Sequence, residues 1–443
     1  MSRRVRRRPV PEGEFSAQVV DLDNDGRGVA RVDGKVVFIA GALPGESVRY
    51  RLRRVSRDAD EADAVAIETP SPQRVQPHCE FFGTQPGACG GCVLQHLAPE
   101  AQVAFKQKQM LDALQRIGGI EPESVAPPLM AEPWGYRRRA RLRVKYVPKK
   151  GGVLVGFNER DTPLLAAIGS CVVLDPRVGT RLRELGQLIA GLSIPAQLPQ
   201  IEVATADSVA LVLRVMQDPT AGDIEALLAF GKEHGFDFYL QRGGLDTIRP
   251  IGSAPPLRYS PDGSDLALEF GPVDFVQVNL AVSQKMVRQA IDWLQPQAGD
   301  EALELFAGLG NFTAPLARSG AQVTAIEGEA ELVRRGQENL ARCGLKARFL
   351  RADLFTPQEQ APWMAQDYDL ALLDPPRSGA REILPYVAAR NPRRIVYVSC
   401  HPGTLARDAG ELVKTHGYRL LRAGVMDMFP HTAHIESMAL FER

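Results

Sequence analysis

The stretch Glu304-Leu-Phe306-Ala-Gly308-Leu-Gly310-Asn311-Phe312-Thr313 decides the fold, because it joins a short apolar strand to a helix start through a glycine-rich turn. The glycines let the backbone turn sharply and lie close to a ligand, and the helix start beyond them offers free N–H groups. A dinucleotide-binding fingerprint would place a third glycine where Thr313 stands. The pattern therefore favours an adenosine ligand without a pyrophosphate over NAD.

Regular alternation of strands and helices extends from about residue 266 to the end of the sequence. The segments between the strands, such as Glu329–Cys343 and Arg381–Arg390, have helical spacing. Short apolar runs without polar alternation are typical of strands buried on both faces of a parallel sheet: Leu303–Phe306, Gln322–Ile326, Ala347–Leu350, Asp369–Leu373 and Ile395–Ser399. We therefore predict a doubly wound, Rossmann-like α/β domain whose ligand lies at the carboxyl ends of the strands.

Acidic side chains follow three successive strands of this predicted sheet. Glu327 ends the second strand, nineteen residues after Gly308, where a carboxylate can accept both ribose hydroxyls. Asp353 follows the third strand and Asp374 the fourth, and these positions suit an adenine amino group and a ligand ammonium. A helix N-cap is the simpler alternative for each acid, and it fits Asp353 best. The three acids together resemble the S-adenosylmethionine (SAM)-dependent methyltransferases of the Rossmann-like class.

Cys400 ends the fifth strand, directly after the strand that leads into Asp374-Pro-Pro-Arg377. A buried packing thiol is the default for a strand-end cysteine, but this topology places Cys400 on the ligand-bearing edge. A methyltransferase needs a covalent nucleophile when its target atom is unreactive, as pyrimidine C5 is, and thiolate addition to C6 makes C5 nucleophilic. A base must then remove the C5 proton. Glu436 is the candidate base, against the alternative of a surface glutamate on an edge strand.

Several segments together resemble the RNA uracil-C5 methyltransferase family: Phe275-Val-Gln277-Val-Asn279, Glu304–Phe312, Asp374-Pro-Pro-Arg377, Val-Ser-Cys400-His-Pro and His434-Ile-Glu436-Ser. The similarity runs from about residue 11 to the end and is strongest after residue 270. The resemblance implies that Cys400 is the nucleophile and Glu436 the base. It also implies a set of SAM-binding residues, namely Gln277, Phe306, Asn311, Glu327, Asp353 and Asp374.

The first 265 residues differ in texture from the C-terminal domain. Residues 1–10 form a predicted disordered basic arm. Short β-rich runs separated by turn signals then predict an OB-like barrel over residues 11–69, the TRAM barrel by resemblance, and such barrels often bind single-stranded nucleic acid. Residues 70–98 and 125–265 form a predicted β-rich central domain. By resemblance, this domain binds RNA and holds an iron–sulfur cluster. Residues 99–124, with a predicted helix from Pro99 to Ile117, belong with residues 266–443 to the methyltransferase domain.

Basic residues are concentrated in two places although the net charge is zero. Residues 1–57 contain 13 Lys/Arg and 7 Asp/Glu, and residues 134–150 contain eight basic residues and no acid. Such runs are often solvated faces, but two of them, the second interleaved with Trp134, Tyr136 and Tyr146, favour a phosphate-backbone partner. No apolar stretch reaches the roughly 18 residues of a membrane span. We therefore expect a cytoplasmic protein without membrane contact.

Cys79, Cys89, Cys92 and Cys171 form a second set of thiols, expected to gather far from Cys400. Cysteines in a long cytosolic chain indicate metal binding or catalysis more often than disulfides. Four thiolates with a Cys-x-x-Cys pair suit tetrahedral zinc or a [4Fe–4S] cluster, and the spacing leaves both open. The resemblance implies the [4Fe–4S] cluster, which the family branch with a TRAM barrel holds through matching cysteines. The segment between the first two of these cysteines is longer here than in the family pattern.

Three features favour RNA over DNA as the substrate: the barrel, the basic arm and the segment Arg137-Arg-Arg-Ala-Arg-Leu-Arg143. The target base must leave its stack to reach the pocket, where Phe275 can stack on it. Barrel and cluster together imply, by resemblance, a 23S rRNA substrate with a site of the uracil-1939 type. The alternatives are the same chemistry on another 23S rRNA site or on tRNA, or a non-catalytic RNA-binding iron–sulfur protein. We expect a monomer.

Overall fold

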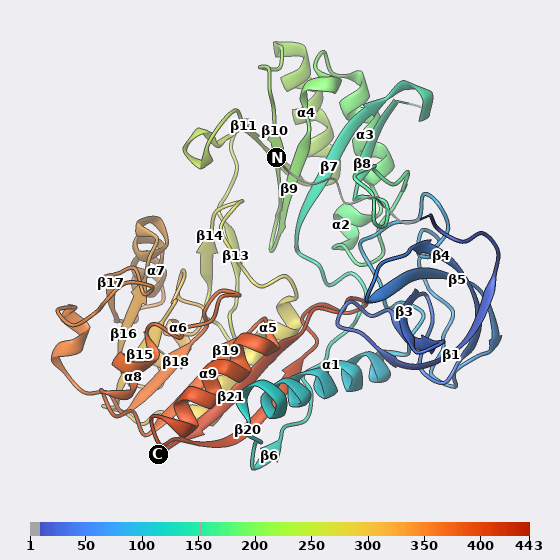
Figure 1. The fold of residues 1–443 in the computed structure, drawn as a ribbon. Coiled ribbons are helices and arrows are strands. Elements are labelled where there is room, and N and C mark those ends of the chain that lie inside the picture. Colours follow the sequence, from blue (N-terminus) through green and yellow to red (C-terminus); the bar gives the residue numbers. More distant parts are fainter. Residues whose placement is uncertain (1–8, 151) are drawn as a thin grey trace, which may run out of the picture.

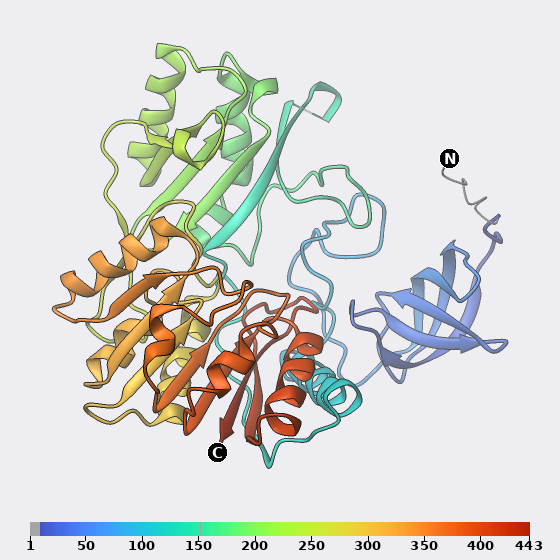
Figure 2. The same cartoon turned by 60° about the vertical axis from the view of Figure 1, so that its left-hand side comes forward.

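The computed structural model describes residues 9–150 and 152–443, so most of the predicted basic arm lies outside the described residues. A small barrel, a central sheet with its helices and a larger α/β sheet can be followed in Figure 1. The barrel stands to one side of the other two parts in Figure 2, and the central sheet lies next to the α/β sheet. Within the described ranges, no helix is long and apolar enough to cross a membrane.

The N-terminal strands close into a barrel in the order β1-β2-β3-β5-β4. Their bounds are β1 (Phe15–Leu22), β2 (Gly28–Val32), β3 (Lys35–Ala40), β4 (Ser47–Arg54) and β5 (Ala59–Thr69). Small and β-branched residues such as Ala30, Val37 and Val48 fill the interior. The sequence predicts these strands at Phe15–Leu22, Gly28–Val32, Lys35–Ile39, Glu46–Val55 and Ala62–Ile67, and the observed bounds agree closely for the first four. The fifth strand, β5, extends further at both ends, because its outer residues pair with β3 and β4 without contributing to the core.

A buried carboxylate connects the barrel to residues 70–98, which include Cys79, Cys89 and Cys92 and are called the cysteine segment below. Glu46 is fully buried and accepts hydrogen bonds from the backbone N–H groups of Leu43 and Ser71, at 2.8 and 3.1 Å. Arg74 donates to both oxygens of the same carboxylate and to the carbonyl of Gly41. Burial alone would raise the pKa of Glu46, but these donors outweigh burial and hold the pKa below its ordinary value.

The central domain contains a sheet in the order β12-β11-β10-β9-β7-β8. Its strands are β7 (Arg139–Val147), β8 (Gly152–Gly156), β9 (Gln200–Thr205), β10 (Val209–Arg214), β11 (Phe236–Gln241) and β12 (Arg249–Pro250). The sheet agrees with the β-rich prediction, but α2 (Pro176–Gly179), α3 (Leu182–Gly191) and α4 (Ala221–His234) were not predicted. Leu185 and Leu227 of α3 and α4 pack in the same core as Leu142 of β7.

The opposite face of the central sheet packs against the α/β domain. Ala210 and Val212 of β10 share a core with the hairpin β13 (Leu257–Tyr259) and β14 (Leu268–Phe270), and with Leu309 of the glycine-rich turn. The alternation of β10 therefore serves a domain contact, because neighbouring side chains of a strand point to opposite faces.

The C-terminal sheet has the order β17-β16-β15-β18-β19-β21-β20-β6, and β17 through β19 run parallel. The strands are β6 (Ser124–Val125), β15 (Glu301–Leu305), β16 (Gln322–Glu327), β17 (Arg348–Arg351), β18 (Leu370–Leu373), β19 (Arg394–Ser399), β20 (Arg419–Met426) and β21 (Glu436–Glu442). The order reverses between β15 and β18, which is where doubly wound sheets bind ligands. The predicted doubly wound α/β fold is confirmed.

Helices cover both faces of this sheet. The helices are α1 (Pro99–Ala113), α5 (Leu280–Leu294), α6 (Thr313–Arg318), α7 (Ala330–Arg342), α8 (Leu384–Ala388) and α9 (Pro402–Lys414). Residues of α1, α8 and α9 share one core, whereas those of α5 and α6 pack in another. The helix predicted from Pro99 to Ile117 corresponds to α1, which continues as a π-helical turn to Gly118. Two elements from early in the chain therefore belong with the C-terminal sheet: α1 packs against it and β6 is its last strand.

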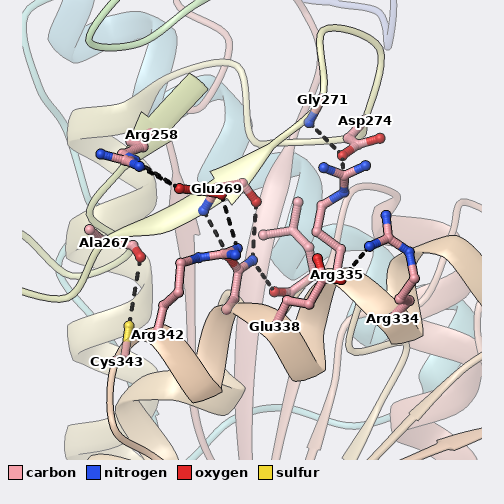
Figure 3. A network of polar contacts seen from close by, with 12 residues as sticks. Arg258, Ala267, Glu269, Gly271, Asp274, Arg334, Arg335, Glu338, Arg342 and Cys343 are labelled. Atoms are coloured by element: carbon pink, nitrogen blue, oxygen red, sulfur yellow. Dashed lines mark hydrogen bonds and ion pairs between the residues drawn. The ribbon is translucent and has the colours of Figure 1, made fainter. Parts of the chain in front are cut away.

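Polar contacts fasten α7 to the β13–β14 hairpin (Figure 3). Glu269 pairs with Arg258 at 2.6 Å and with Arg342 at 3.3 Å. The fully buried Asn339 donates to the carbonyls of Glu269 and Leu309, at 3.1 and 3.0 Å. The hydrogen bond to the Leu309 carbonyl thus connects the glycine-rich turn to α7.

Cys343 lies at the end of this network, also shown in Figure 3. The sequence predicts that Cys343 is a packing residue in the middle of a helix, but it caps the end of α7, and its thiol donates to the carbonyl of Ala267 at 3.6 Å. Its half-buried side chain packs against the hairpin core, which agrees with the predicted packing role.

The loop between β20 and β21 connects parts of the chain that are distant in sequence. Lys106 of α1 donates to the carboxylate of Asp427 at 2.6 Å and to the carbonyl of Phe429 at 2.9 Å, and both charged side chains are almost fully buried. Lys106 is thus the only counter-charge that the described residues give to Asp427.

His431 is the centre of the same loop. It adopts a left-handed conformation, with φ of 65°. Its N–H donates to Gln102 at 2.8 Å, its carbonyl accepts from Val93 and Leu94, and its ring stacks on Trp134 with centroids 3.9 Å apart. The loop therefore ties α1 and the cysteine segment to the strand that begins at Glu436.

Lys106→Met is expected to destabilise the protein by about 3–5 kcal/mol, because it leaves the Asp427 carboxylate buried without a counter-charge. The double variant Lys106→Met/Asp427→Leu should recover most of this loss, since neither charge then remains. Urea unfolding followed by circular dichroism measures both effects. Lys108→Met on the exposed side of α1 is the matched control, with an expected loss below about 1 kcal/mol. A Lys106→Met variant as stable as this control would contradict the prediction.

Candidate active site

The glycine-rich turn after β15 has the geometry of a ligand-binding loop. Gly308 and Gly310 adopt φ values of 57° and 104°, which glycine adopts without steric cost. A Cβ at Gly308 would meet no atom within 4 Å, so the backbone is open on that side. Phe306 also has a positive φ, 63°, which is rare for an aromatic residue and marks a functional constraint.

Glu327 lies opposite this turn, as the sequence predicted. Its carboxylate accepts from the backbone N–H groups of Gly308 and Glu329, at 3.0 and 2.9 Å. These bonds orient the carboxylate at the end of β16. Asp353 is exposed after β17, and one of its oxygens accepts from the N–H of Phe355 at 3.0 Å. This Asx turn is a local role close to the capping alternative considered from the sequence.

Gln277 and Asn311 are connected through the side chains of Arg138 and Tyr259. The Tyr259 hydroxyl donates to the side-chain oxygen of Asn311 at 3.1 Å, and Arg138 donates to the backbone carbonyl of Gln277 at 2.7 Å. The Arg138 guanidinium lies 4.5 Å from the centre of the Tyr259 ring. A single buried arginine thus links two of the predicted cofactor-binding residues.

Buried carboxyl groups line the edge where the strand order reverses. Desolvation raises the pKa of Asp374, after β18, to about 7. Glu304 of β15 is 1 % exposed, and burial raises its pKa to about 8. Neither carboxylate oxygen of Glu304 has a hydrogen-bond partner among the described residues. The unpaired, buried Glu304 carboxyl and the nearby Asp374, beside an open glycine turn, fit a ligand that carries an ammonium and a sulfonium, as SAM does.

The structure brings Cys400 and Glu436 together. β19 and β21 pair antiparallel with Ser399 opposite Ser437, and the Ser437 hydroxyl donates to the Ser399 carbonyl at 3.2 Å. The next residues toward the ligand edge are Cys400 and Glu436. Glu436 is 4 % exposed, so the alternative of a surface glutamate is wrong.

Mutual electrostatics set the protonation of this pair. Burial, and then the charges of Glu436 and Asp374, raise the pKa of the Cys400 thiol to about 11, while Arg377 opposes them. Burial and the charge of Asp374 raise the pKa of Glu436 to about 8. Both groups are therefore mainly protonated at pH 7, and any positive charge placed near Asp374 favours the thiolate.

Cys400 opens into a channel of about 1740 Å³ that reaches the barrel. Arg137, Arg141 and Arg143 line this channel, whereas Arg138 is buried and the half-buried Arg139 does not line it. The basic segment is thus only partly the phosphate-facing surface that the sequence predicted. Arg138, just before β7, and Arg139, at its start, instead donate to the backbone carbonyls of Gln277 and Pro272.

The second set of thiols, Cys79, Cys89, Cys92 and Cys171, lines the same channel. The thiols lie close enough to influence one another's ionisation: burial, and then neighbouring thiols among other groups, raises the pKa of Cys89 to about 11 and that of Cys92 to about 12. The N–H of Gly91 donates to the Cys89 sulfur at 3.5 Å. In residues 9–150 and 152–443, however, no group of three or more His, Cys, Asp or Glu side chains is arranged as a metal site. The channel shared with Cys400 was not predicted.

Two residues of the site escaped the sequence-based prediction. Glu304 stands in the quoted turn, and its signal was an acid within an otherwise apolar buried strand. Arg138 was hidden in an arginine run, where only the strand alternation distinguishes it from its neighbours.

Glu436→Gln is expected to speed alkylation of Cys400 by iodoacetamide at pH 9, by about threefold or more, because it removes a charge that raises the thiol pKa. At pH 6.5 the two proteins should react alike, since Glu436 is then protonated in the wild type. Peptide-resolved mass spectrometry measures the rate, and Cys343 is the internal control. Equal rates for Cys400 at pH 9 would show that the two groups do not interact.

Comparison with known proteins places this geometry among described families. Residues 262–352 and 361–443 match the tRNA (Uracil-5-)-methyltransferase family, and residues 14–65 match the TRAM domain. A 23S rRNA (uracil(1939)-C(5))-methyltransferase RlmD of Alkalilimnicola ehrlichii is 51 % identical over 99 % of this chain and 98 % of its own length. Another, of Methylococcus capsulatus, is 48 % identical over the full length of both.

A solved structure supports the same fold. The Pyrococcus abyssi tRNA (uracil-54, C5)-methyltransferase, crystallised with S-adenosyl-L-homocysteine, covers 96 % of this chain and is itself covered completely, with a TM-score of 0.73 and 24 % identity. At that identity the likeness concerns the arrangement of the chain, which is that of a SAM methyltransferase.

Proposed function

The chain belongs to the RNA uracil-C5 methyltransferase family, and from that membership we propose that it methylates C5 of one uridine in 23S rRNA with SAM as methyl donor. The RlmD relatives carry uracil 1939 in their names, and identity over almost the whole chain supports the same site. The observation that carries the proposal is the position of Cys400 next to Glu436, at the end of a channel lined by arginines.

Cys400 is the proposed nucleophile. Its sulfur adds to C6 of the flipped uracil, the C5–C6 double bond becomes an enolate, and C5 takes the methyl group. SAM supplies that electrophilic methyl when bound. Arg377 lowers the thiol pKa, and a cationic cofactor held beside Asp374 would lower it further by offsetting the charge of that carboxylate.

Glu436 is the proposed base. After methyl transfer, C5 carries both a methyl group and a proton, and Glu436 removes this proton. The electron pair re-forms the C5–C6 double bond and expels the Cys400 sulfur. The raised pKa of Glu436 makes its ionised form a stronger base than an ordinary carboxylate.

The cofactor residues keep the roles that the resemblance implies. We assign SAM binding to Gln277, Phe306, Asn311, Glu327, Asp353 and Asp374, and add the ammonium-facing Glu304. The open backbone at Gly308 and the two unpaired oxygens of Glu304 support this assignment. In this arrangement Glu327 orients the ribose, and the buried acids complement the positive charges of the donor.

RNA is proposed to lie along the channel between the barrel and the catalytic thiol. Arg137, Arg141 and Arg143 provide phosphate contacts, and Phe275, with 73 % of its surface exposed, is free to stack on a base. The TRAM match supports a role for residues 11–69 in RNA binding. The division into this barrel, a central part (70–98, 125–265) and a catalytic part (99–124, 266–443) is part of the proposal, and a cytoplasmic monomer remains a prediction.

We further propose that Cys79, Cys89, Cys92 and Cys171 hold a [4Fe–4S] cluster. Four soft sulfur donors, mutual proximity and a backbone N–H directed at Cys89 fit such a group. The residues that follow the first three cysteines reach His431 through Val93 and Leu94, so the cluster would brace the loop that leads to Glu436.

RNA that contains 5-fluorouridine at the target is expected to form an SDS-stable adduct with the wild type in the presence of SAM. Fluorine replaces the proton that Glu436 removes, so the Cys400 sulfur stays bonded to C6. Gel electrophoresis of labelled RNA detects the adduct. Cys400→Ala should form none, and Cys343→Ala should form the wild-type amount. An adduct with Cys400→Ala would overturn the mechanism, and none with the wild type would favour a non-catalytic RNA-binding protein.

Protein purified without oxygen is expected to be brown and to contain about four irons per chain. Cys92→Ser should lose most of the iron and the visible absorbance, whereas Cys343→Ser should keep both. Metal analysis and absorption spectroscopy provide the measurement. Colourless protein loaded with zinc would replace the cluster with a tetrahedral zinc site.

A further inference from the structure

Arg138 is a buried cation without an anion. Its side chain is 4 % exposed, and its Nε donates to the Gln277 carbonyl at 2.7 Å. The two terminal nitrogens, Nη1 and Nη2, are buried and have no hydrogen-bond partner in the part of the chain that the structure describes. A guanidinium carries five N–H donors, so four of them are unused here.

This arrangement is costly for the protein alone. Burial lowers the pKa of Arg138 to about 10, so the group still carries its charge at neutral pH. The ring of Tyr259, with its centre 4.5 Å away, compensates part of the cost through a cation–π contact. The free edge formed by Nη1 and Nη2 of this planar group is a geometry that binds a carboxylate through paired hydrogen bonds.

The neighbours of Arg138 indicate which anion it takes. Gln277 and Asn311, two of the proposed cofactor residues, lie next to it, the first by a direct hydrogen bond and the second through Tyr259. Arg137 and Arg141, in contrast, line the channel proposed for RNA, whereas Arg138 does not. The free donors thus belong to the cofactor side of the site.

We propose that Arg138 binds the α-carboxylate of the methionine part of SAM; this inference rests on the proposed function. The cofactor then meets opposite charges at both ends of its amino-acid moiety: Arg138 faces the carboxylate, and Glu304 with Asp374 faces the ammonium. Arg138 is also a positioning residue, since its bond to the Gln277 carbonyl links the central domain to the cofactor pocket.

The test compares two ligands by isothermal titration calorimetry. One is S-adenosylhomocysteine, and the other is the same molecule with its carboxylate replaced by hydrogen. The wild type should prefer the first, and Arg138→Met should reduce this preference about 10- to 100-fold. Arg138→Lys, which keeps the charge, should retain a larger preference than Arg138→Met. Arg139→Met, which changes a half-buried neighbour that donates to the Pro272 carbonyl, should leave the preference unchanged.

The ratio of two affinities does not depend on the fraction of folded protein, so a destabilised variant still gives an answer. An unchanged preference in Arg138→Met overturns the inference, and so does an equal weakening of both ligands, which would indicate a structural role. Weaker RNA binding with unchanged preference would assign Arg138 to a phosphate instead. Failure of the wild type to bind S-adenosylhomocysteine at all would overturn the proposed function.

Discussion

The active site depends on one buried junction, the loop between β20 and β21. Lys106 neutralises Asp427 inside the protein, and His431 is held by α1, by the cysteine segment and by the ring of Trp134. Glu436 begins β21 immediately after this loop. The junction therefore holds the start of β21, and the pairing of β21 with β19 places the Glu436 carboxylate next to the Cys400 thiol.

Charge in the pocket is balanced for a bound cation. Asp374, Glu304 and Glu436 are buried carboxyl groups whose pKa values rise to between about 7 and about 8. After burial, the charges of Glu436 and Asp374 also raise the pKa of the Cys400 thiol. The free protein therefore keeps its thiol protonated and unreactive, and the charge of a methyl donor bound at the proposed site would favour both the thiolate and the ionised acids.

Sequence reasoning predicted what depends on local pattern. Apolar runs marked the parallel strands, and the residues that end them, such as Glu327 and Asp374, followed from the topology of a doubly wound sheet. Contacts between distant segments left no such mark. The pairing of Lys106 with Asp427, the isolation of Arg138 and the packing of α3 and α4 on the central sheet all depend on tertiary neighbours.

The order in which the chain is synthesised gives the junction a further consequence. His431 is synthesised more than 300 residues after Gln102, Val93 and Leu94, yet these residues need it as a hydrogen-bond partner. The barrel has its own core and can fold while translation continues. The cysteine segment and α1 cannot complete their contacts until the loop between β20 and β21 has left the ribosome, so the proposed catalytic pair of Cys400 and Glu436 assembles late in synthesis.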